Sequence, residues 1–171
     1  MDLKKVIRTV PDFPKPGILF YDIASLMRDA GAWNAAIAQM IEKIKPYQPQ
    51  YLAAVDARGF LFAGAIAQHL DCGIIMVRKK GKLPGEVIEH SYSLEYGSGT
   101  LEAQVGMFDA GARIVIVDDL LATGGTLSAA VMLLKKLGGD VRAAVTFIEL
   151  DGLGGRSLAE VPVESILTYA A

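Results

Sequence analysis

Residues 115–126 read VIVDDLLATGGT, and this stretch decides the fold. Val115, Ile116 and Val117 are typical of a strand that is buried on both faces. Two carboxylates, Asp118 and Asp119, come at its end, and a loop of small residues then opens a helix. Because open α/β sheets bind their ligands at the carboxyl ends of the strands, the stretch predicts a binding site here.

The chemistry of this stretch indicates two kinds of ligand group. In the loop Thr123-Gly124-Gly125-Thr126, backbone N–H groups can converge, and the helix behind them favours an anion at its N-terminus. A phosphate therefore fits the loop. Carboxylates repel phosphate, but they suit hydroxyl groups or a metal ion held near them. A ligand with a phosphate at one end and a diol at the other is a phosphorylated sugar.

Hydrophobic periodicity extends this unit into an α/β fold with a central, mainly parallel sheet flanked by helices. The main elements that we expect are strands over 51–56, 73–78, 113–118, 141–150 and 163–169, and helices over 32–45, 60–70 and 124–137. Short helices are also expected over residues 2–8 and near residues 155–160.

Two segments do not fit the alternation. Residues 11–24 carry three prolines within six positions, which predicts irregular backbone. Residues 79–103 are polar and long for a connection in a compact domain, and such segments are usually lids or binding loops. They contain two alternating runs, Ser91–Glu95 and Thr100–Ala103, which we expect to pair as a hairpin.

Composition limits the classes of function. With 171 residues the chain is expected to form one domain, and 52% of the residues are hydrophobic. The net charge of −2 gives no general electrostatic support for nucleic-acid binding. Cys72 is the one cysteine, so no disulfide within the chain is expected. The first residues lack the apolar region of a signal peptide, and no apolar run reaches membrane-spanning length. We expect a cytoplasmic protein with no membrane partner and no nucleic-acid partner.

The stretch at residues 114–126 resembles the phosphoribosyl diphosphate (PRPP) signature of the type I phosphoribosyltransferases. The competing phosphate motifs, a P-loop and a dinucleotide fingerprint, are absent from the sequence. Four further segments resemble the members of this family that act on adenine, along nearly the full length of the chain. They are Asp12–Phe20, Asp56–Phe62, Arg78–Gly85 followed by Tyr92–Gly97, and Ile148–Leu150.

This resemblance implies the organisation of the chain. It implies one phosphoribosyltransferase domain with a base-covering hood over residues 11–24 and a flexible lid loop over residues 81–103. It also implies the reaction of adenine with PRPP to give AMP and diphosphate, a homodimer, and Mg²⁺ held mainly by PRPP near Asp118 and Asp119, with no residue assigned as a metal ligand.

The resemblance assigns roles to individual residues. Glu95 and Tyr96 are implied to be catalytic. The implied adenine contacts are Leu19, Phe20, Arg58 and Leu150. The implied PRPP contacts are Arg58, Gly59, Arg78, Lys82, Asp118, Asp119, Ala122, Thr123, Gly124, Gly125 and Thr126.

Several alternatives stay open at this stage. Taken without the resemblance, Arg58 is as consistent with an ordinary surface arginine, and the basic run 78–82 with a solvated face. Lys79 and Lys80 have no assigned role. Tyr21 stands where many members have arginine, and residues 151–157 depart from the usual pattern. The competing functions are transfer to another base and a PRPP-sensing regulator that binds DNA, which would need a helix-turn-helix or a basic face.

Overall fold

The computed structural model describes residues 1–93 and 97–171. The chain forms two compact units, residues 1–39 and residues 40–171. Helix α2 (Ala30–Ile44) belongs to both ranges. It matches the helix expected over residues 32–45.

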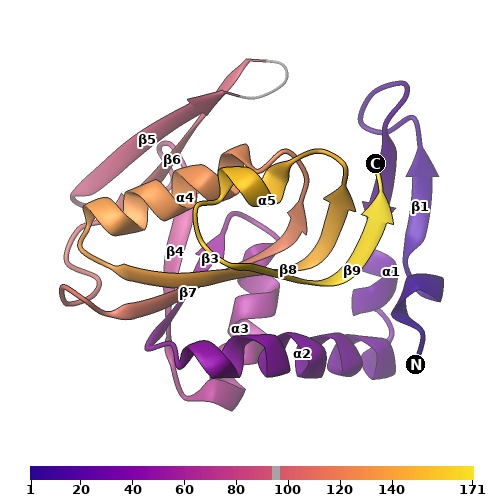
Figure 1. Cartoon of the computed structure of the whole chain (residues 1–171), viewed down its shortest axis with the longest axis horizontal. Helices are drawn as coiled ribbons and strands as arrows, with labels where there is room; N and C mark the ends of the chain where they lie inside the picture. The colour runs from indigo at the N-terminus through magenta and orange to yellow at the C-terminus, as the bar shows by residue number, and fades with distance from the viewer. Residues whose placement is uncertain (94–96) are drawn as a thin grey trace. The chain divides into compact units, whose positions relative to one another are not determined.

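A single sheet organises residues 40–171 (Figure 1). In the described part of this unit, its seven strands follow the order β5-β6-β4-β3-β7-β8-β9. The five strands from β4 to β9 in this order are parallel, and β6 and β5 are antiparallel additions at one edge. The mainly parallel sheet predicted from the sequence is therefore confirmed. The strands are β3 (Tyr51–Val55), β4 (Gly73–Lys79), β5 (Val87–Ser93), β6 (Ser98–Gln104), β7 (Arg113–Leu121), β8 (Asp140–Asp151) and β9 (Val163–Ala170).

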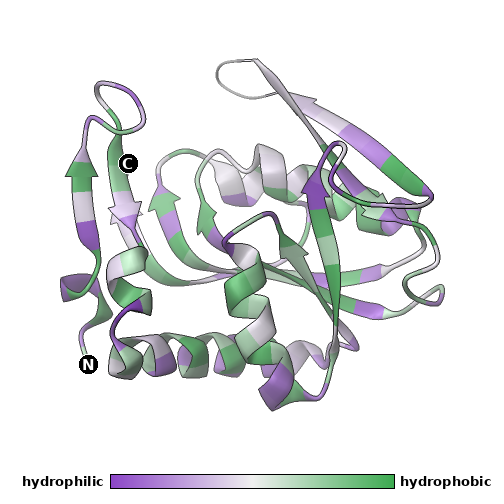
Figure 2. Ribbon diagram, turned by 180° about the vertical axis from the view of Figure 1, so that it is seen from behind, coloured by the Kyte–Doolittle hydropathy of each residue, from purple (hydrophilic) through white to green (hydrophobic). Residues whose placement is uncertain are grey.

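Helices lie on both faces of this sheet. Helix α4 (Gly125–Lys136) and the short α5 (Gly155–Leu158) lie on one face, and α3 (Gly59–Leu70) on the other. A 3₁₀ helix, η2 (Lys45–Tyr47), precedes β3. The alternation of strand side chains explains the two layers: Ala53 and Val55 belong to the core under α4, whereas Phe62 of α3 stacks on Phe147 of β8 with ring centroids 5.5 Å apart. Figure 2 shows hydrophobic residues dominating the central strands.

The predicted hairpin is present but its strands are longer than expected. Strands β5 and β6 pair from Val87↔Gln104 to Ser93↔Ser98, and β6 also pairs with β4 through Arg78↔Glu102. The hairpin extends alongside α4 from the edge of the sheet (Figure 1). Much of residues 81–103 is therefore paired strand. Glu95 and Tyr96 lie outside the described residues.

The predicted end of the strand over 113–118 is wrong. Strand β7 continues to Leu121, because β8 continues beside it and pairs Leu120 with Ile148. Asp118 and Asp119 therefore lie within the last residues of β7 and not after the strand.

Residues 1–39 contain more regular structure than the sequence indicates. The helix predicted over residues 2–8 is limited to a 3₁₀ helix, η1 (Leu3–Lys5), and is followed by β1 (Arg8–Pro11). The stretch expected to be irregular contains β2 (Leu19–Asp22), which pairs antiparallel with β1, and α1 (Ala24–Met27) begins at its end. Pro11 is compatible with β1 because it ends a strand of a two-stranded sheet.

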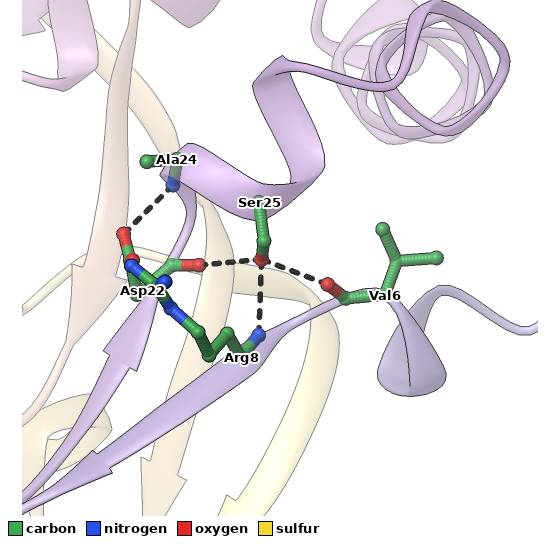
Figure 3. Close-up of polar contacts among 5 residues, drawn as sticks. All are labelled: Val6, Arg8, Asp22, Ala24 and Ser25. Atoms are coloured by element: carbon green, nitrogen blue, oxygen red, sulfur yellow. Dashed lines mark hydrogen bonds and ion pairs between the residues drawn. The ribbon is translucent and has the colours of Figure 1, made fainter.

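Ser25 ties these short elements together (Figure 3). Its hydroxyl accepts the N–H of Arg8 at 3.0 Å and lies 2.8 Å from the carbonyl oxygens of Val6 and Asp22. The guanidinium of Arg8 donates from Nε to the Asp22 carboxylate at 3.1 Å. The half-buried Ser25 and the ion pair between Arg8 and Asp22 therefore hold β1, β2 and α1 together.

Candidate active site at the carboxyl ends of β3 and β7

A cleft of about 460 Å³ lies where β3 and β7 end. Most of the residues predicted to bind PRPP lie in its wall, as do Asp56 and Ala57 at the end of β3. The lining residues are Asp56, Ala57, Arg58, Lys79, Tyr92, Leu101, Asp118, Asp119, Leu120, Leu121, Ala122, Thr123, Gly124, Gly125, Thr126 and Leu127. The fold thus brings together two segments that are about sixty residues apart in the chain.

The loop at residues 122–126 leads directly into α4. Gly124 precedes the helix with a φ of +86°, in the left-handed region that favours glycine. Helix α4 then begins at Gly125, and the first N–H groups of a helix have no partner within it. These N–H groups and the dipole of a twelve-residue helix make the loop suitable for a phosphate.

The two carboxylates differ in environment. Asp119 is buried, with 7% of its surface exposed, and Asp118 is half-buried. The backbone N–H of Asp119 donates to Oδ1 of Asp118 at 2.8 Å. Burial raises the pKa of Asp118 well above its usual range, and the negative charge of Asp119 raises it further. The site therefore holds a carboxyl group that gains a proton more readily than an exposed aspartate does.

Arg58 faces the second carboxylate from the turn between β3 and α3. Its Nε donates to Oδ2 of Asp119 at 2.5 Å. Gly59 makes this approach possible, because a Cβ atom at that position would lie 2.7 Å from the carbonyl oxygen of Val117. Gly59 itself is not among the described residues that line the cleft, so its observed role is to let α3 pack closely on β7.

The basic segment after β4 is divided between two environments. Lys79, which the sequence left without a role, lines the cleft, whereas Arg78 and Lys82 are not among its described lining residues. Nε of Arg78 donates to Asp56 at 3.1 Å, and its guanidinium lies over the ring of Phe60, 5.4 Å from the centroid. Arg78 therefore stabilises the wall of the cleft through its contact with Asp56, without lining the cleft itself.

Glu102 on β6 organises the turn that carries Lys82. Its buried carboxylate accepts the backbone N–H groups of Gly81, Lys82 and Leu83 at 3.1, 2.9 and 2.7 Å. Burial acts to raise the pKa of Glu102, but the three backbone hydrogen bonds outweigh it and lower the pKa. No role was predicted for Glu102, because an isolated Glu on a short alternating run carries no signal for a partner twenty positions away.

Tyr92 is a second residue that sequence reasoning missed. It lies on β5, and its hydroxyl accepts a hydrogen bond from Thr126 Oγ1 at 3.3 Å. Its ring also lies against Gly125, where a Cβ atom would be 3.3 Å from it. The hairpin therefore contacts the first turn of α4. Its place in the alternating run beginning at Ser91 could have indicated an inward side chain.

The residues implied to bind adenine are placed in both units. Leu19 and Phe20 lie on β2 in residues 1–39, where Leu19 is 46% exposed and Phe20 contacts Phe13 edge-to-face at 5.1 Å. Leu150 lies half-buried near the end of β8 in residues 40–171. Their joint role stays a prediction, as do the roles of Glu95 and Tyr96, which lie outside the described residues.

Comparison with known proteins identifies the family. A model of the phosphoribosyl transferase domain matches residues 24–164. The chain is 54% identical over 169 residues to adenine phosphoribosyltransferase of Gluconacetobacter diazotrophicus, covering 99% of this chain and 96% of that protein. The chain belongs to the adenine phosphoribosyltransferase family. The enzyme of that name from Rhodospirillum rubrum is 52% identical, and 99% of each chain is covered.

Solved structures of this family have the same fold. Adenine phosphoribosyltransferase of Thermoanaerobacter pseudethanolicus matches with a TM-score of 0.95 and 41% identity, with 98% of each chain covered. The Saccharomyces cerevisiae enzyme, solved with adenine and D-2,5-dideoxy-2,5-imino-altritol 1,6-bisphosphate, matches with a TM-score of 0.91 and 37% identity, with 97% of each chain covered. Among the helices of the described residues, none combines the length and the apolar composition that a membrane span requires.

Proposed function

We propose that this chain transfers the phosphoribosyl group of PRPP to adenine, giving AMP and diphosphate in purine salvage. The observation that carries the proposal is the cleft that joins the Asp118–Asp119 pair to the loop at 122–126. The relatives that match nearly the full chain are named for this reaction.

In the proposed complex the 5′-phosphate of PRPP lies on residues Ala122–Thr126, at the N-terminus of α4. The ribose hydroxyls then meet Asp118 and Asp119, whose oxygens accept hydrogen bonds from them. The diphosphate faces the turn at Asp56–Arg58, with Lys79 on the same wall. This order follows the charges of the wall: N–H groups and cations meet phosphates, Asp118 and Asp119 meet hydroxyls, and the carboxylate of Asp56 is paired with Arg78.

The chain has little covalent chemistry to perform. A ring nitrogen of adenine forms a bond to C1′ while the bond from C1′ to the diphosphate oxygen breaks, and the base then loses a ring proton. The residues of the cleft hold the sugar in line for this attack, and closure around it excludes water that would hydrolyse PRPP. We assign the proton to Glu95, with Tyr96 beside it, on the family resemblance.

The donor set of the cleft fits Mg²⁺. Carboxylate oxygens are ligands that Mg²⁺ prefers, and it usually binds through one or two of them together with substrate phosphates. Among residues 1–93 and 97–171, no three or more His, Cys, Asp or Glu side chains gather to hold an ion by themselves. On the family resemblance we propose that PRPP supplies most of the ligands, near Asp118 and Asp119. When bound, the ion neutralises charge on the departing diphosphate.

For the base we propose Leu19, Phe20 and Leu150 as contacts, with backbone groups near Leu19 reading the amino edge of adenine. Hypoxanthine reverses the donor and acceptor at that edge, and polar sites of this kind discriminate by roughly 10⁴ or more. Arg58, also implied at the base, faces Asp119 in the structure. Its role toward adenine stays a proposal of the resemblance alone.

We also propose a homodimer. Ile74 and Met76 alternate on β4 with core residues and are 45% and 42% exposed, and Leu61 of α3 is 49% exposed. These large exposed apolar side chains lie on two contacting elements, α3 and β4, and such surfaces favour association. Sedimentation equilibrium of the parent and of Met76→Glu tests this: we expect a dimer that the charge weakens, and a monomeric parent would contradict it. We also propose that the enzyme works in the cytoplasm.

The decisive experiment is PRPP-dependent turnover with a panel of adenine, hypoxanthine, guanine, xanthine and orotate. We expect turnover with adenine to exceed the others by roughly 10⁴ in kcat/KM. Comparable turnover with an oxopurine or with orotate would assign the enzyme to another base. Absence of turnover with every base would contradict the transferase itself. Glu95→Gln should lower the single-turnover rate by roughly 10²–10⁴ without altering PRPP binding.

A further inference from the structure

Helix α5 is anchored by an ion pair that the proposed mechanism does not use. Nε and Nη2 of Arg156 donate to the two carboxylate oxygens of Glu149, each at 2.6 Å, and Nη1 donates to the carbonyl oxygen of Val163. Glu149 is buried with 6% of its surface exposed, and the hydrogen bonds from Arg156 lower its pKa. A guanidinium fork on a carboxylate fixes both distance and orientation. Arg156 therefore joins α5 to β8 and β9 rigidly.

The anchored end of α5 lies directly behind the phosphate loop. A Cβ atom on Gly155 would overlap the carbonyl oxygen of Ala122 and approach Leu121 within 2.9 Å. In the other direction, a Cβ atom on Gly124 would lie 2.5 Å from the carbonyl oxygen of Gly155. The nearest contacts in both directions are therefore with backbone atoms, which cannot adapt as the end of a flexible side chain can, and the Leu121 side chain packs beside them. A shift of α5 must move the loop or open a gap behind it.

We propose that Arg156 is a positioning residue for phosphate binding: it holds Gly155 against Ala122 and Gly124, and so keeps the N–H groups of the loop convergent. The proposal rests on the proposed function, in which this loop binds the 5′-phosphate of PRPP. It gives a role to residues 154–156, in the segment that departs from the usual family pattern. Arg156 itself does not line the cleft among the described residues.

The experiment measures binding of ribose 5-phosphate by calorimetry, together with KM for PRPP and for adenine. Arg156→Gln removes the fork, and Arg156→Lys keeps the charge but not the two parallel bonds. Gly155→Ala perturbs the same contact without touching the ion pair. Arg142→Gln is the matched control, because Arg142 pairs with Asp140 at 2.6 Å at the other end of β8. Gly64→Ala is the control for the glycine, since nothing lies within 4 Å of a Cβ there.

We expect Arg156→Gln and Gly155→Ala each to weaken ribose 5-phosphate binding and raise KM for PRPP by about tenfold, with a smaller change in KM for adenine. Arg156→Lys should lie between them and the parent, and both controls should match the parent. Because Arg156→Gln leaves a buried carboxylate unpaired, it can fail to fold. Two variants avoid this unpaired charge. The double variant Arg156→Gln with Glu149→Gln removes both charges of the ion pair, and Gly155→Ala leaves the ion pair intact.

Each outcome decides between explanations. A role in stability alone would lower Tm and the active fraction but leave the ribose 5-phosphate affinity of the folded protein unchanged, which would overturn the proposal. A parent that binds ribose 5-phosphate with every variant equal to it would overturn the role of Arg156 and leave the phosphate loop standing. A parent that does not bind ribose 5-phosphate would overturn both the loop assignment and this inference.

Discussion

Arg58 and Asp119 form an ion pair with Nε 2.5 Å from Oδ2, although they are 61 positions apart in the chain. The pair joins the turn after β3 to the end of β7. Arg58, which we propose to face the diphosphate, therefore contacts Asp119, which we propose to bind a ribose hydroxyl. PRPP must therefore share or replace this pair when it enters the cleft.

Arg58→Gln is the first test of this relationship. We expect KM for PRPP to rise by about 10-fold or more, because a hydrogen bond to a charged group contributes roughly 1.5–3 kcal/mol. Stability should also fall, because Arg58→Gln leaves the buried carboxylate of Asp119, whose side chain is 10% exposed, without its ion-pair partner. Initial rates and a thermal melt measure both. An unchanged KM for PRPP would show that Arg58 serves only to hold Asp119.

Asp118→Asn separates function from stability. The raised pKa of Asp118 comes first from burial and then from the charge of Asp119, so the folded state binds its proton more tightly than the unfolded state does. Its ionisation therefore opposes folding, and stability falls as pH rises from the unfolded value toward the raised one. Without ligand, Asp118→Asn should raise Tm at neutral pH by about 2–4 °C, as for ~1 kcal/mol. It should also weaken PRPP use by roughly 10-fold.

The control for this prediction is Asp109→Asn, an exposed aspartate outside the cleft. It should leave both Tm and KM for PRPP near the parental values. The gain in Tm of Asp118→Asn should also shrink as pH falls through the raised pKa of Asp118 and vanish below the unfolded value of 3.8, where the parental carboxyl is protonated in both states. A variant that is less stable than the parent at neutral pH would show that the Asp118 charge is compensated in the folded protein.

How far the sequence predicts this structure depends on where the partners of each residue lie. The strand at Val115–Val117 and the loop at 122–126 can be predicted from the sequence. The hydrophobic pattern of the strand, the small residues of the turn and the start of the helix follow one another directly along the chain. The end of β7 is not, because Leu120 and Leu121 stay in the sheet only through pairing with β8. Local preference at Asp118 and Asp119 favours a strand end, and a neighbouring strand overrides it.

The same reasoning applies to residues 8–22 and to the back of the phosphate loop. Strand β2 exists because it pairs with β1, and the prolines between them indicate only the loop. Lys79 and Tyr92 reach the cleft from β4 and β5, and Gly155 supports it from behind. Those placements depend on the order of strands in the sheet, which no single stretch of the sequence encodes. Family resemblance could assign Arg58 because its motif is local.

Glu102→Gln tests the turn at residues 81–83. An amide keeps the shape of the side chain, but it replaces one oxygen acceptor by a donor and removes the charge, so the N–H groups of Gly81, Lys82 and Leu83 lose strong partners. We expect a loss of about 1.5–3 kcal/mol, or a fall in Tm of several degrees. Glu89→Gln, at an exposed pair with Lys80, is the matched control and should have little effect.

The pH dependence of that loss has a definite sign. The pKa of Glu102 is lowered in the folded state, so its contribution to stability is present above the unfolded value of 4.5 and is lost as pH falls through the folded pKa. The difference in Tm between the parent and Glu102→Gln should therefore be constant near neutrality and narrow in acid. A difference that grows on acidification would contradict the role of the carboxylate as an acceptor.

The contact of Tyr92 with Thr126 links the β5–β6 hairpin to the first turn of α4. Tyr92→Phe removes the hydroxyl and keeps the ring, so it should change kcat/KM by only about 2–10-fold, the value of one neutral hydrogen bond. Tyr92→Ala also removes the ring that lies against Gly125 and leaves the hairpin without this anchor. If the hairpin excludes water from the cleft, Tyr92→Ala should raise hydrolysis of PRPP relative to transfer, measured as ribose 5-phosphate formed per AMP. Ser91→Ala is the control, because Ser91 pairs with Thr100 across the hairpin and is exposed. Equal product ratios for the parent, Tyr92→Ala and Ser91→Ala would mean that the hairpin contact supports the fold of α4 and has no part in excluding water.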